Sequence, residues 1–200
     1  RDRLHPLLLQ RAAAAGATVL QPARVPRMHS SDNGVVGELH AGDRVVHVRA
    51  RIAVAAHGSW EPAPGTNGRV VRDPRRASDL FAFKANYVDA RLAAGLLPVL
   101  SFAGGYGGIV LGDDGRTTLA CCIRRDALRR ARAAEPGAGA GAAIERSLLR
   151  ECPPLRDLLC DATRVGGWLS VGPIRPGVRV AAARARVFPV GNAAGESHPL

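Results

Sequence analysis

The chain has 200 residues, a mean hydropathy of −0.01 and a formal net charge of +11. This length allows one or two domains with a hydrophobic core, and no apolar segment is long enough to cross a membrane. The charge alone would suit a nucleic-acid-binding protein, but the arginines are scattered, aromatic residues are few and no recognised binding motif is present. We therefore expect no nucleic-acid partner.

The four cysteines are Cys121, Cys122, Cys152 and Cys160. They contain no C-x-x-C pair, so no metal site is predicted. Cys121 and Cys122 are adjacent in a predicted strand, where their side chains would point to opposite faces and form a poor disulfide. This pattern is typical of reduced thiols, and we expect a cytoplasmic location. No signal peptide is visible, and because the sequence starts at Arg1 without Met and ends inside a motif, we expect it to be a fragment.

The first part of the chain predicts a helix followed by strands. Leucines and alanines at helical spacing predict a helix that begins at Leu4 and stops at Gly16. Two alternating runs around the turn Ala41-Gly42-Asp43 predict a β-hairpin, and the more apolar run after it predicts a buried strand. The short strand, the loop, the two hairpin strands and the buried strand are expected over residues 17–20, 21–33, 35–40, 44–49 and 50–56.

A second region follows a segment, residues 61–79, whose Pro, Gly and Arg content predicts a linker. Several strands joined by short turns, including Gly112-Asp113-Asp114-Gly115, then predict an antiparallel sheet. Its strands are expected over residues 80–88, 96–102, 108–111, 117–123 and 168–171. Helices that cover one face of this sheet are expected over residues 126–134, 142–151 and 155–162.

The last strand, residues 187–190, leads into Gly191-Asn192-Ala193-Ala194-Gly195-Glu196-Ser197-His198-Pro199-Leu200. Gly191 permits a tight turn, and the small residues after it keep side-chain bulk away from an approaching ligand. Such a segment can bring backbone N–H groups to a phosphate at the start of a helix. An ordinary strand-to-helix turn would have the same pattern, so the interpretation depends on the rest of the chain.

This stretch resembles the second FAD fingerprint, G-D-A-A-G-x-x-x-P, of the flavoprotein monooxygenase and geranylgeranyl reductase superfamily. In that family the Asp holds a ribityl hydroxyl of FAD, and the following amides face the pyrophosphate. Here Asn192 replaces the Asp and can hold a hydroxyl without bringing a charge. The resemblance implies that FAD is the cofactor and that its contacts include Gly191, Asn192, Ala193, Ala194, Gly195 and Pro199.

Two earlier segments resemble other motifs of the same superfamily. Arg1 and the helix after it resemble R-x-x-L-D-x-x-L-L, whose Arg lies near the flavin, although His5 stands where Asp is usual. The turn His57-Gly58-Ser59-Trp60-Glu61-Pro62 resembles A-D-G-x-x-S, which touches the flavin and a nicotinamide cofactor. The resemblance implies that Arg1 and Gly58 contact FAD and that NAD(P)H is a candidate electron donor. His57 replaces the Asp of this motif, and a lone His in a turn is more often structural than catalytic.

The run Gly104-Gly105-Tyr106-Gly107-Gly108-Ile109-Val110 resembles the G-Y-x-W-x-F-P strand of geranylgeranyl-reductase-like flavoproteins, which edges their substrate cavity. The Trp and Phe of the motif are absent here, which leaves room in the cavity. The resemblance implies that Gly105, Tyr106 and Gly107 bind the substrate. Glycines in a strand mark close approach by another backbone or a ligand, but a glycine-rich loop explains the run equally well.

The sequence as a whole predicts an α/β (α+β) protein. An FAD/NAD(P)-binding Rossmann-like domain with a three-stranded β-meander would carry an inserted antiparallel β-sheet substrate domain covered by helices. The G-x-G-x-x-G turn that opens such domains is absent from this sequence. The partial FAD-binding domain, the substrate-binding domain and the return to the FAD-binding domain are expected over residues 1–72, 73–180 and 181–200.

The function implied by the resemblance is that of an FAD-dependent monooxygenase that hydroxylates a small apolar, aromatic or polyketide-like molecule. The alternatives are a flavin-dependent reductase of C=C bonds in isoprenoids, a non-catalytic flavoprotein-like domain and a basic nucleic-acid-binding domain. Flavin-dependent halogenases are related, but their W-x-W-x-I-P motif is absent. Hydrolase and ATPase functions lack a recognisable motif. The sequence indicates neither a catalytic residue nor the oligomeric state.

Overall fold

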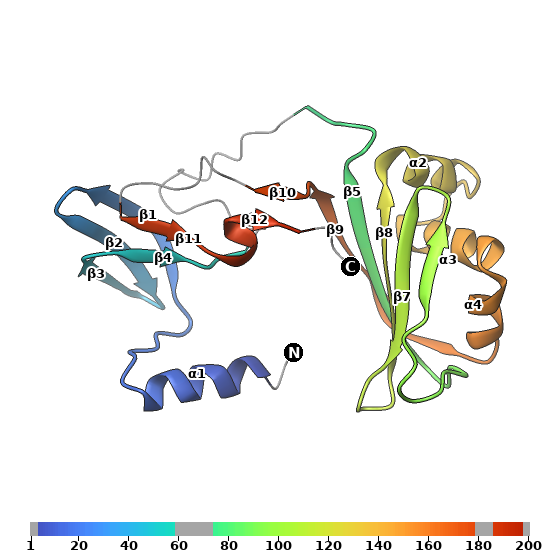
Figure 1. Cartoon of the computed structure of the whole chain (residues 1–200), viewed down its shortest axis with the longest axis horizontal. Helices are drawn as coiled ribbons and strands as arrows, with labels where there is room; N and C mark the ends of the chain where they lie inside the picture. Colours follow the sequence, from blue (N-terminus) through green and yellow to red (C-terminus); the bar gives the residue numbers. More distant parts are fainter. Residues whose placement is uncertain (1–3, 59–73, 179–185, 198–200) are drawn as a thin grey trace. The chain divides into compact units, whose positions relative to one another are not determined.

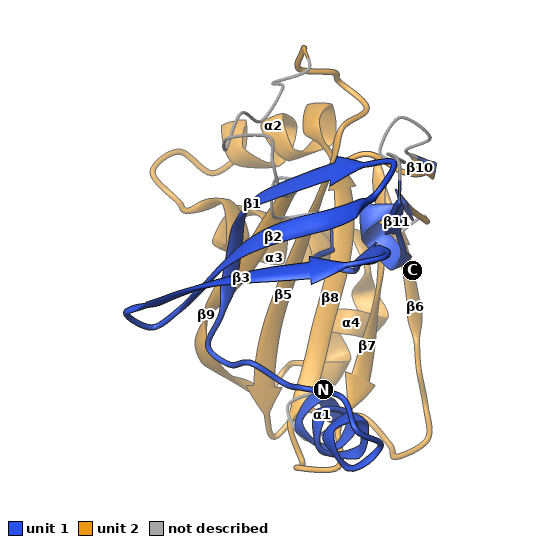
Figure 2. Ribbon diagram, turned by 90° about the vertical axis from the view of Figure 1, so that its left-hand side faces the viewer, with its two compact units in different colours: residues 1–72, 178–195 blue, residues 73–177, 196–200 orange. Residues whose placement is uncertain are grey.

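The computed structural model describes residues 4–58, 74–178 and 186–197. The chain divides into two compact units, which Figure 2 colours separately. Unit 1 comprises residues 1–72 and 178–195, and unit 2 comprises residues 73–177 and 196–200. The architecture is α+β, with antiparallel sheets and a few helices, in agreement with the predicted fold class at that level.

Unit 1 begins with helix α1 (Leu4–Ala14), which is followed by an antiparallel sheet of order β1-β2-β3. The strands of this sheet are β1 (Arg24–Ser31), β2 (Gly34–Ala41) and β3 (Arg44–Ala50). The predicted hairpin is β2–β3, and the turn at Gly42 has a φ of 60°, which glycine adopts without strain.

Strand β1 lies where the sequence predicts a loop, and the strand expected over residues 17–20 is absent. The misleading residue is Pro26, which cannot donate a hydrogen bond to a sheet. A proline is tolerated on an edge strand, and β1 is an edge of its sheet, with a register shift between Arg24 and Arg27. The prediction was wrong because the sequence does not reveal which strand lies at an edge.

A parallel pair of strands completes unit 1. Strand β4 (Ala53–Ala55) pairs in parallel with β11 (Val187–Pro189). The buried strand predicted over residues 50–56 is shorter than expected, and Val54 is 60% exposed. Among the described residues, β11 is the only strand beside β4. The segment after β11 also differs from prediction, since a single 3₁₀ turn, η2 (Gly191–Ala193), replaces the expected helix start.

Strand β12 (Gly195–Glu196) follows η2 and pairs with β10 (Gly177–Val178). This pairing takes the chain from the turn directly into extended backbone. In this structure η2 is therefore followed by a strand and not by a helix.

Unit 2 is an antiparallel sheet of order β6-β7-β8-β5-β9, with helices on one of its faces (Figure 1). The strands are β5 (Leu80–Val88), β6 (Val99–Phe102), β7 (Gly105–Leu111), β8 (Thr117–Arg124) and β9 (Thr163–Ile174). The helices are α2 (Arg125–Ala133), α3 (Ala140–Glu151) and α4 (Pro153–Leu158). The glycine-rich run predicted as either strand or loop is part of β7.

The core of unit 2 lies between the sheet and its helices. Alternate residues of the strands face the helices, and the fully buried side chains include Ile109, Leu119, Ile144, Leu148 and Leu155. Burying a side chain of this size contributes about 1.5–3 kcal/mol of hydrophobic stabilisation. Core side chains therefore occupy the helix-facing side of the sheet, and only the other face is available to a ligand.

A polar cluster inside this packed layer fixes α3 to β9. The carboxylate of Glu145 accepts hydrogen bonds from the Tyr87 hydroxyl at 2.6 Å and from the Trp168 indole at 3.1 Å. Arg164 lies 3.6 Å from the same carboxylate, and the Trp168 ring meets Phe83 edge to face. Burial is the main reason that the pKa of Tyr87 is raised, so this hydroxyl remains a donor at neutral pH.

A buried aspartate links the start of β5 to the end of β9 and to the start of α2. Asp79 precedes β5, and its side chain is 1% exposed. Arg175, just after β9, donates to Asp79 Oδ1 at 2.6 Å, and Arg125, the first residue of α2, donates to Oδ2 at 2.9 Å. The Arg76 amide donates to Oδ2 at 3.0 Å. The Arg175 hydrogen bond is the main cause that holds the pKa of Asp79 well below its usual range, although burial opposes it.

We expect Asp79→Asn to reduce the stability of unit 2 by about 3–5 kcal/mol, because both guanidinium groups lose their charged partner. The wild-type stabilisation should be complete above the unfolded-state pKa of about 4 and should fall as the pH drops below it, because the folded-state pKa is depressed. Amide hydrogen exchange of peptides from β5 and β9 measures both effects.

The matched control is Asp161→Asn, which removes an ion pair with Arg91 between side chains that are 58% and 65% exposed. Exposed pairs contribute little, so its exchange pattern should equal that of the wild type. Equal protection of β5 in the Asp79→Asn and Asp161→Asn variants would show that the buried cluster does not stabilise unit 2.

Candidate functional site

The parallel pairing of β4 and β11 brings two distant segments of unit 1 to the same sheet edge. Ala53 pairs with Val187 and Ala55 with Pro189, and the Val190 amide continues the pairing with a hydrogen bond to Ala55 O at 3.0 Å. Because the strands are parallel, their carboxyl ends meet, and the turn at 57–58 lies beside the turn at 191–194. Ligands of open α/β sheets bind at such an edge.

The turn after β11 is tight, as Gly191 predicts, although a strand and not a helix follows it. Gly191 has a φ of 57°, and a Cβ added to it would meet no atom within 4 Å. A larger residue would be strained there by its backbone conformation, while the space beside the glycine is open. Asn192 is exposed, and Ala193 is buried. The amide of Ala194 already donates to Gly191 O at 3.0 Å, so a contact between this amide and a phosphate stays a prediction.

The turn after β4 contains a buried polar atom without a partner. His57 Nδ1 is inaccessible to solvent, and no described residue forms a hydrogen bond with it. An unpaired buried nitrogen costs about 1–3 kcal/mol, so this position favours a hydrogen-bonding group beyond the described residues. Gly58, the next residue, has a φ of 78°, which glycine adopts readily.

The structure thus brings together the predicted FAD contacts that it describes in unit 1. Gly58 lies at the carboxyl end of β4, and Gly191, Asn192, Ala193 and Ala194 lie at the carboxyl end of β11. Gly195 begins β12. The predicted contacts Arg1 and Pro199 lie outside the described residues.

The three predicted substrate-binding residues lie on β7 but on opposite faces. A Cβ on Gly107 would lie 2.5 Å from Ala120 O and 2.8 Å from Cys121 Cβ, and a Cβ on Gly105 would meet the Phe102 ring. These two glycines therefore face neighbours within unit 2, and their packing alone explains why they are glycines. Tyr106 points to the other face, so a contact with substrate is sterically open to its side chain.

Sequence reasoning did not reveal the neighbours of Tyr106. It shares a hydrogen bond with Cys122, its partner in the register of β7 and β8. Burial is the main cause that raises the pKa of both groups, and the carboxylate of Glu196 raises that of Cys122 further. Glu196 belongs to unit 2 and is 8% exposed. Both the phenol and the thiol are therefore protonated at neutral pH and act as hydrogen-bonding groups.

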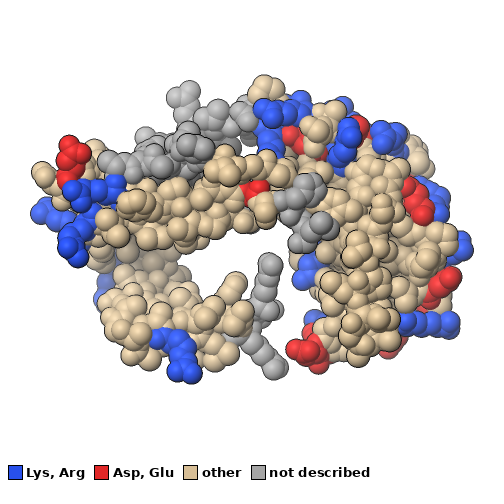
Figure 3. All heavy atoms as spheres, in the orientation of Figure 1, with Lys and Arg blue, Asp and Glu red and all other residues tan. Residues whose placement is uncertain are grey.

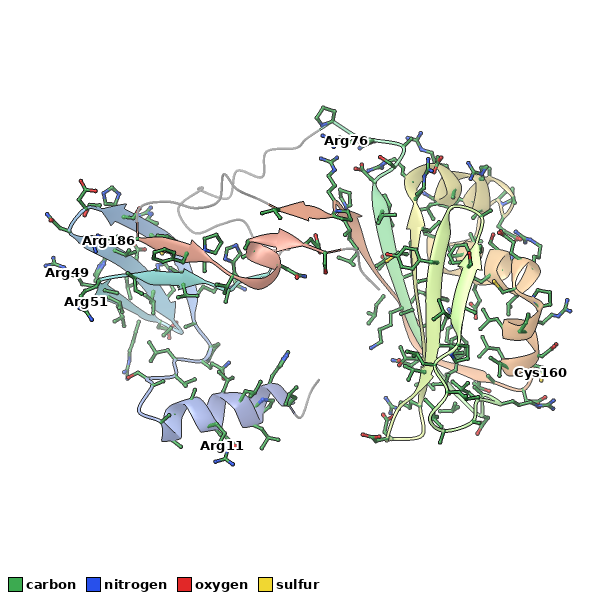
Figure 4. The ribbon with its side chains drawn as sticks, viewed as in Figure 1. Arg11, Arg49, Arg51, Arg76, Cys160 and Arg186 are labelled. Carbon is green, nitrogen blue, oxygen red and sulfur yellow. The ribbon has the colours of Figure 1, made fainter. Side chains whose placement is uncertain are left out.

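Lys and Arg side chains gather over α2 and at one end of unit 1 (Figure 3). Arg49, Arg51 and Arg186 form part of the latter group, and Arg186 also donates to Arg51 O at 3.4 Å (Figure 4). Several arginines of unit 2 are neutralised locally, as in the pairs of Arg146 and Arg150 with Glu135.

The described residues also limit two other kinds of site. Over residues 4–58, 74–178 and 186–197, no group of His, Cys, Asp or Glu side chains is arranged to hold a metal ion. Within the same ranges, no helix has the length and apolarity needed to cross a membrane.

The sequence matches no protein-family model and no curated protein. Solved structures do match it. The flavin-dependent halogenase CmlS superposes with a TM-score of 0.79 at 22% identity, over 100% of this chain and 36% of CmlS. The myxobacterial chondrochloren halogenase CndH gives 0.78 at 22% identity, over 100% of this chain and 46% of CndH. A geranylgeranyl bacteriochlorophyll reductase-like protein from Thermoplasma acidophilum gives 0.66 at 16% identity, over 97% of this chain and 47% of that protein.

The chain has the fold of these three proteins. The resemblance to the flavoprotein monooxygenase and geranylgeranyl reductase superfamily is thereby confirmed at the level of the fold. The chain spans less than half the length of each of the three proteins.

Within this flavoprotein fold, adjacent glycines of β7 should differ sharply in their tolerance of a side chain. Gly107→Ala places a methyl group against the Ala120 carbonyl and Cys121, and should destabilise unit 2 by about 1–3 kcal/mol. Gly108→Ala has Pro98 O at 3.3 Å as its nearest neighbour and should cost less than about 1 kcal/mol. Pulse proteolysis in urea, with mass spectrometry to identify fragments of unit 2, compares the two. Equal midpoints would show that Gly107 does not lie against β8.

Proposed function

We propose that this chain is part of an FAD-dependent oxidoreductase. Unit 1 would be part of its Rossmann-like FAD-binding domain, with β1–β3 as the three-stranded meander. Unit 2 would be the inserted substrate domain. The observation that carries this proposal is the meeting of segments 57–58 and 191–195 at the carboxyl edge of β4 and β11, the edge at which such folds bind nucleotides.

The residues at this edge fit a dinucleotide. The open space beside Gly191 and the small side chains after it leave room for a phosphate, and the N–H groups of η2 are potential donors to it. The exposed Asn192 amide suits a ribityl hydroxyl. The unpaired His57 Nδ1 gives a second polar contact on the neighbouring strand end. When bound and reduced by an electron donor, FAD would supply the electrons for the reaction, and the chain would bind and orient it.

The reaction that we favour is monooxygenation of a small apolar, aromatic or polyketide-like molecule. One oxygen atom of O₂ would enter the substrate, and the other would leave as water with electrons from reduced FAD. NAD(P)H is the candidate source of those electrons. The support for the reaction class is the likeness of the fold to the anhydrotetracycline hydroxylase OxyS from Streptomyces rimosus, with a TM-score of 0.61. The support for the substrate class is that most side chains on the helix-free face of unit 2 are uncharged, with Lys84 as an exception.

We expect Asn192→Ala in the full-length protein to weaken FAD binding roughly 5- to 150-fold, because a buried ligand hydroxyl loses a partner worth about 1–3 kcal/mol. Asn192→Asp should bind FAD comparably, since its carboxylate accepts the same hydrogen bond. Fluorescence titration of the apoprotein with FAD measures the affinities, and a melting curve of each variant separates binding from stability.

The matched control is Asn33→Ala in the β1–β2 turn, an exposed Asn of the same unit. It should leave FAD affinity unchanged. If Asn192→Ala lowers the melting temperature but binds FAD as tightly as the wild type does, Asn192 only shapes the turn, and the FAD-binding proposal loses its central residue.

Halogenation is the second candidate reaction, because the two halogenases give higher TM-scores than the hydroxylase. Against it, the W-x-W-x-I-P motif of flavin-dependent halogenases is absent from the sequence. We expect the full-length protein, supplied with a flavin reductase, oxygen and a panel of aromatic acids and phenols, to add oxygen to its substrate whether or not bromide is present. Mass spectrometry distinguishes the products. A bromine isotope pattern that depends on bromide would instead establish the halogenase.

A further inference from the structure

The register of unit 2 defines the face of the sheet that its helices leave free (Figure 1). We call it the open face. Its residues form cross-strand rows that follow the pairing of β6, β7, β8, β5 and β9, and the β5–β9 register shifts once, between the second row at Lys84 and the third row at Asn86. The first row is Ser101, Tyr106, Cys122, Ala82 and Val171. The second row is Val99, Gly108, Ala120, Lys84 and Leu169. The third row is Val110, Thr118, Asn86 and Val165.

Lys84 is the one cation in these rows. It is also the only lysine of the chain, while the remaining basic charge is carried by arginine. Its side chain is exposed, its cross-strand partners are Ala120 and Leu169, and no described residue forms a salt bridge with it. The acidic side chain known to act on this face is Glu196, through its effect on Cys122 in the neighbouring row.

The side chains around this ammonium group suit a flat apolar molecule. Gly108 and Ala120 lie in the same row as Lys84 and present almost no bulk above the sheet. Val99 and Leu169 end the row on either side, and their apolar side chains are 72% and 64% exposed. A planar ring system laid across Gly108 and Ala120 would cover both side chains and reach Lys84 with one edge.

The third row supplies further polar contacts. Thr118 Oγ1 donates to Asn86 Oδ1 at 2.9 Å, and the Asn86 amide nitrogen is a donor next to Lys84 on the same strand face. An ammonium and an amide N–H together match the two oxygens of a carboxylate. A carboxylate is ionised at neutral pH, whereas an ordinary phenol is not.

We propose that the open face binds a planar apolar molecule that bears a carboxylate, with Lys84 as the residue that holds the carboxylate. The proposal rests on the proposed function, in which unit 2 is the substrate domain, and it narrows the substrate class to aromatic or polyketide-like acids. Lys84 acts as a specificity-determining residue: it selects the charged form of the ligand, while the rows of small and apolar residues accept the ring system.

The test uses the full-length protein and two probes of the same shape, 2-naphthoate and the neutral 2-naphthamide. Isothermal titration calorimetry at one fixed ionic strength gives both dissociation constants. The wild type should bind the carboxylate about tenfold more tightly than the amide, because a charge-assisted hydrogen bond is lost with the amide. Lys84→Met, which keeps the apolar stem, should bind both probes equally, and Lys84→Arg should retain the preference.

Arg129→Met is the matched control, because Arg129 is an exposed cation on α2, away from the open face. It should behave as the wild type does. The proposal is overturned if the wild type shows no preference or binds neither probe, or if Lys84→Met retains the preference. Flavin content, measured from absorbance of the same preparations, is a separate readout: a colourless protein that still prefers the carboxylate refutes the flavoprotein function but not this binding site.

Discussion

The pairing of β4 with β11 is the constraint on which the rest of the structure depends. Parallel strands cannot be joined by a tight turn, so the chain between them must leave the sheet and return. In this protein the intervening chain includes residues 73–177, which make up nearly all of unit 2. The same pairing aligns the carboxyl ends of two strands. This alignment places two motifs that are weak individually, at 57–58 and at 191–195, at one candidate binding edge.

An ion pair in unit 2 likewise links two segments that are distant in the sequence, the start of β5 and the end of β9. The chain begins β5 just after Asp79 and completes β9 just before Arg175, and the ion pair between these residues joins the first and last parts of the unit. Arg125, the first residue of α2, also pairs with the Asp79 carboxylate. Its guanidinium carbon lies over the Phe81 ring, 4.8 Å from the ring centroid. Buried ion pairs are weak sources of net stability but costly to break. Asp79 therefore specifies where the strands begin and end more than it stabilises the core.

Much of this arrangement was predictable from local sequence, because periodicity and turn residues act over short distances. The hairpin at Gly42 and the helices of unit 2 are examples. The failures depend on long-range partners: β1 was missed because Pro26 is acceptable only on an edge strand, and the start of β9 was missed because Gly166 and Gly167 interrupt its alternation. Asp79 was assigned to a linker, since nothing in the sequence indicates that Arg125 and Arg175 meet it.

The two faces of the unit 2 sheet explain how one fold accommodates different ligands. On the packed face, residues such as Gly107 and Leu119 are fixed by neighbours within the unit, so changes there cost stability. On the open face, Gly108, Ala120 and Lys84 have few contacts to lose, so they can change without loss of folding. A fold shared at 22% identity with two halogenases is therefore compatible with different side chains on the open face, because those side chains are not the ones that hold the sheet together.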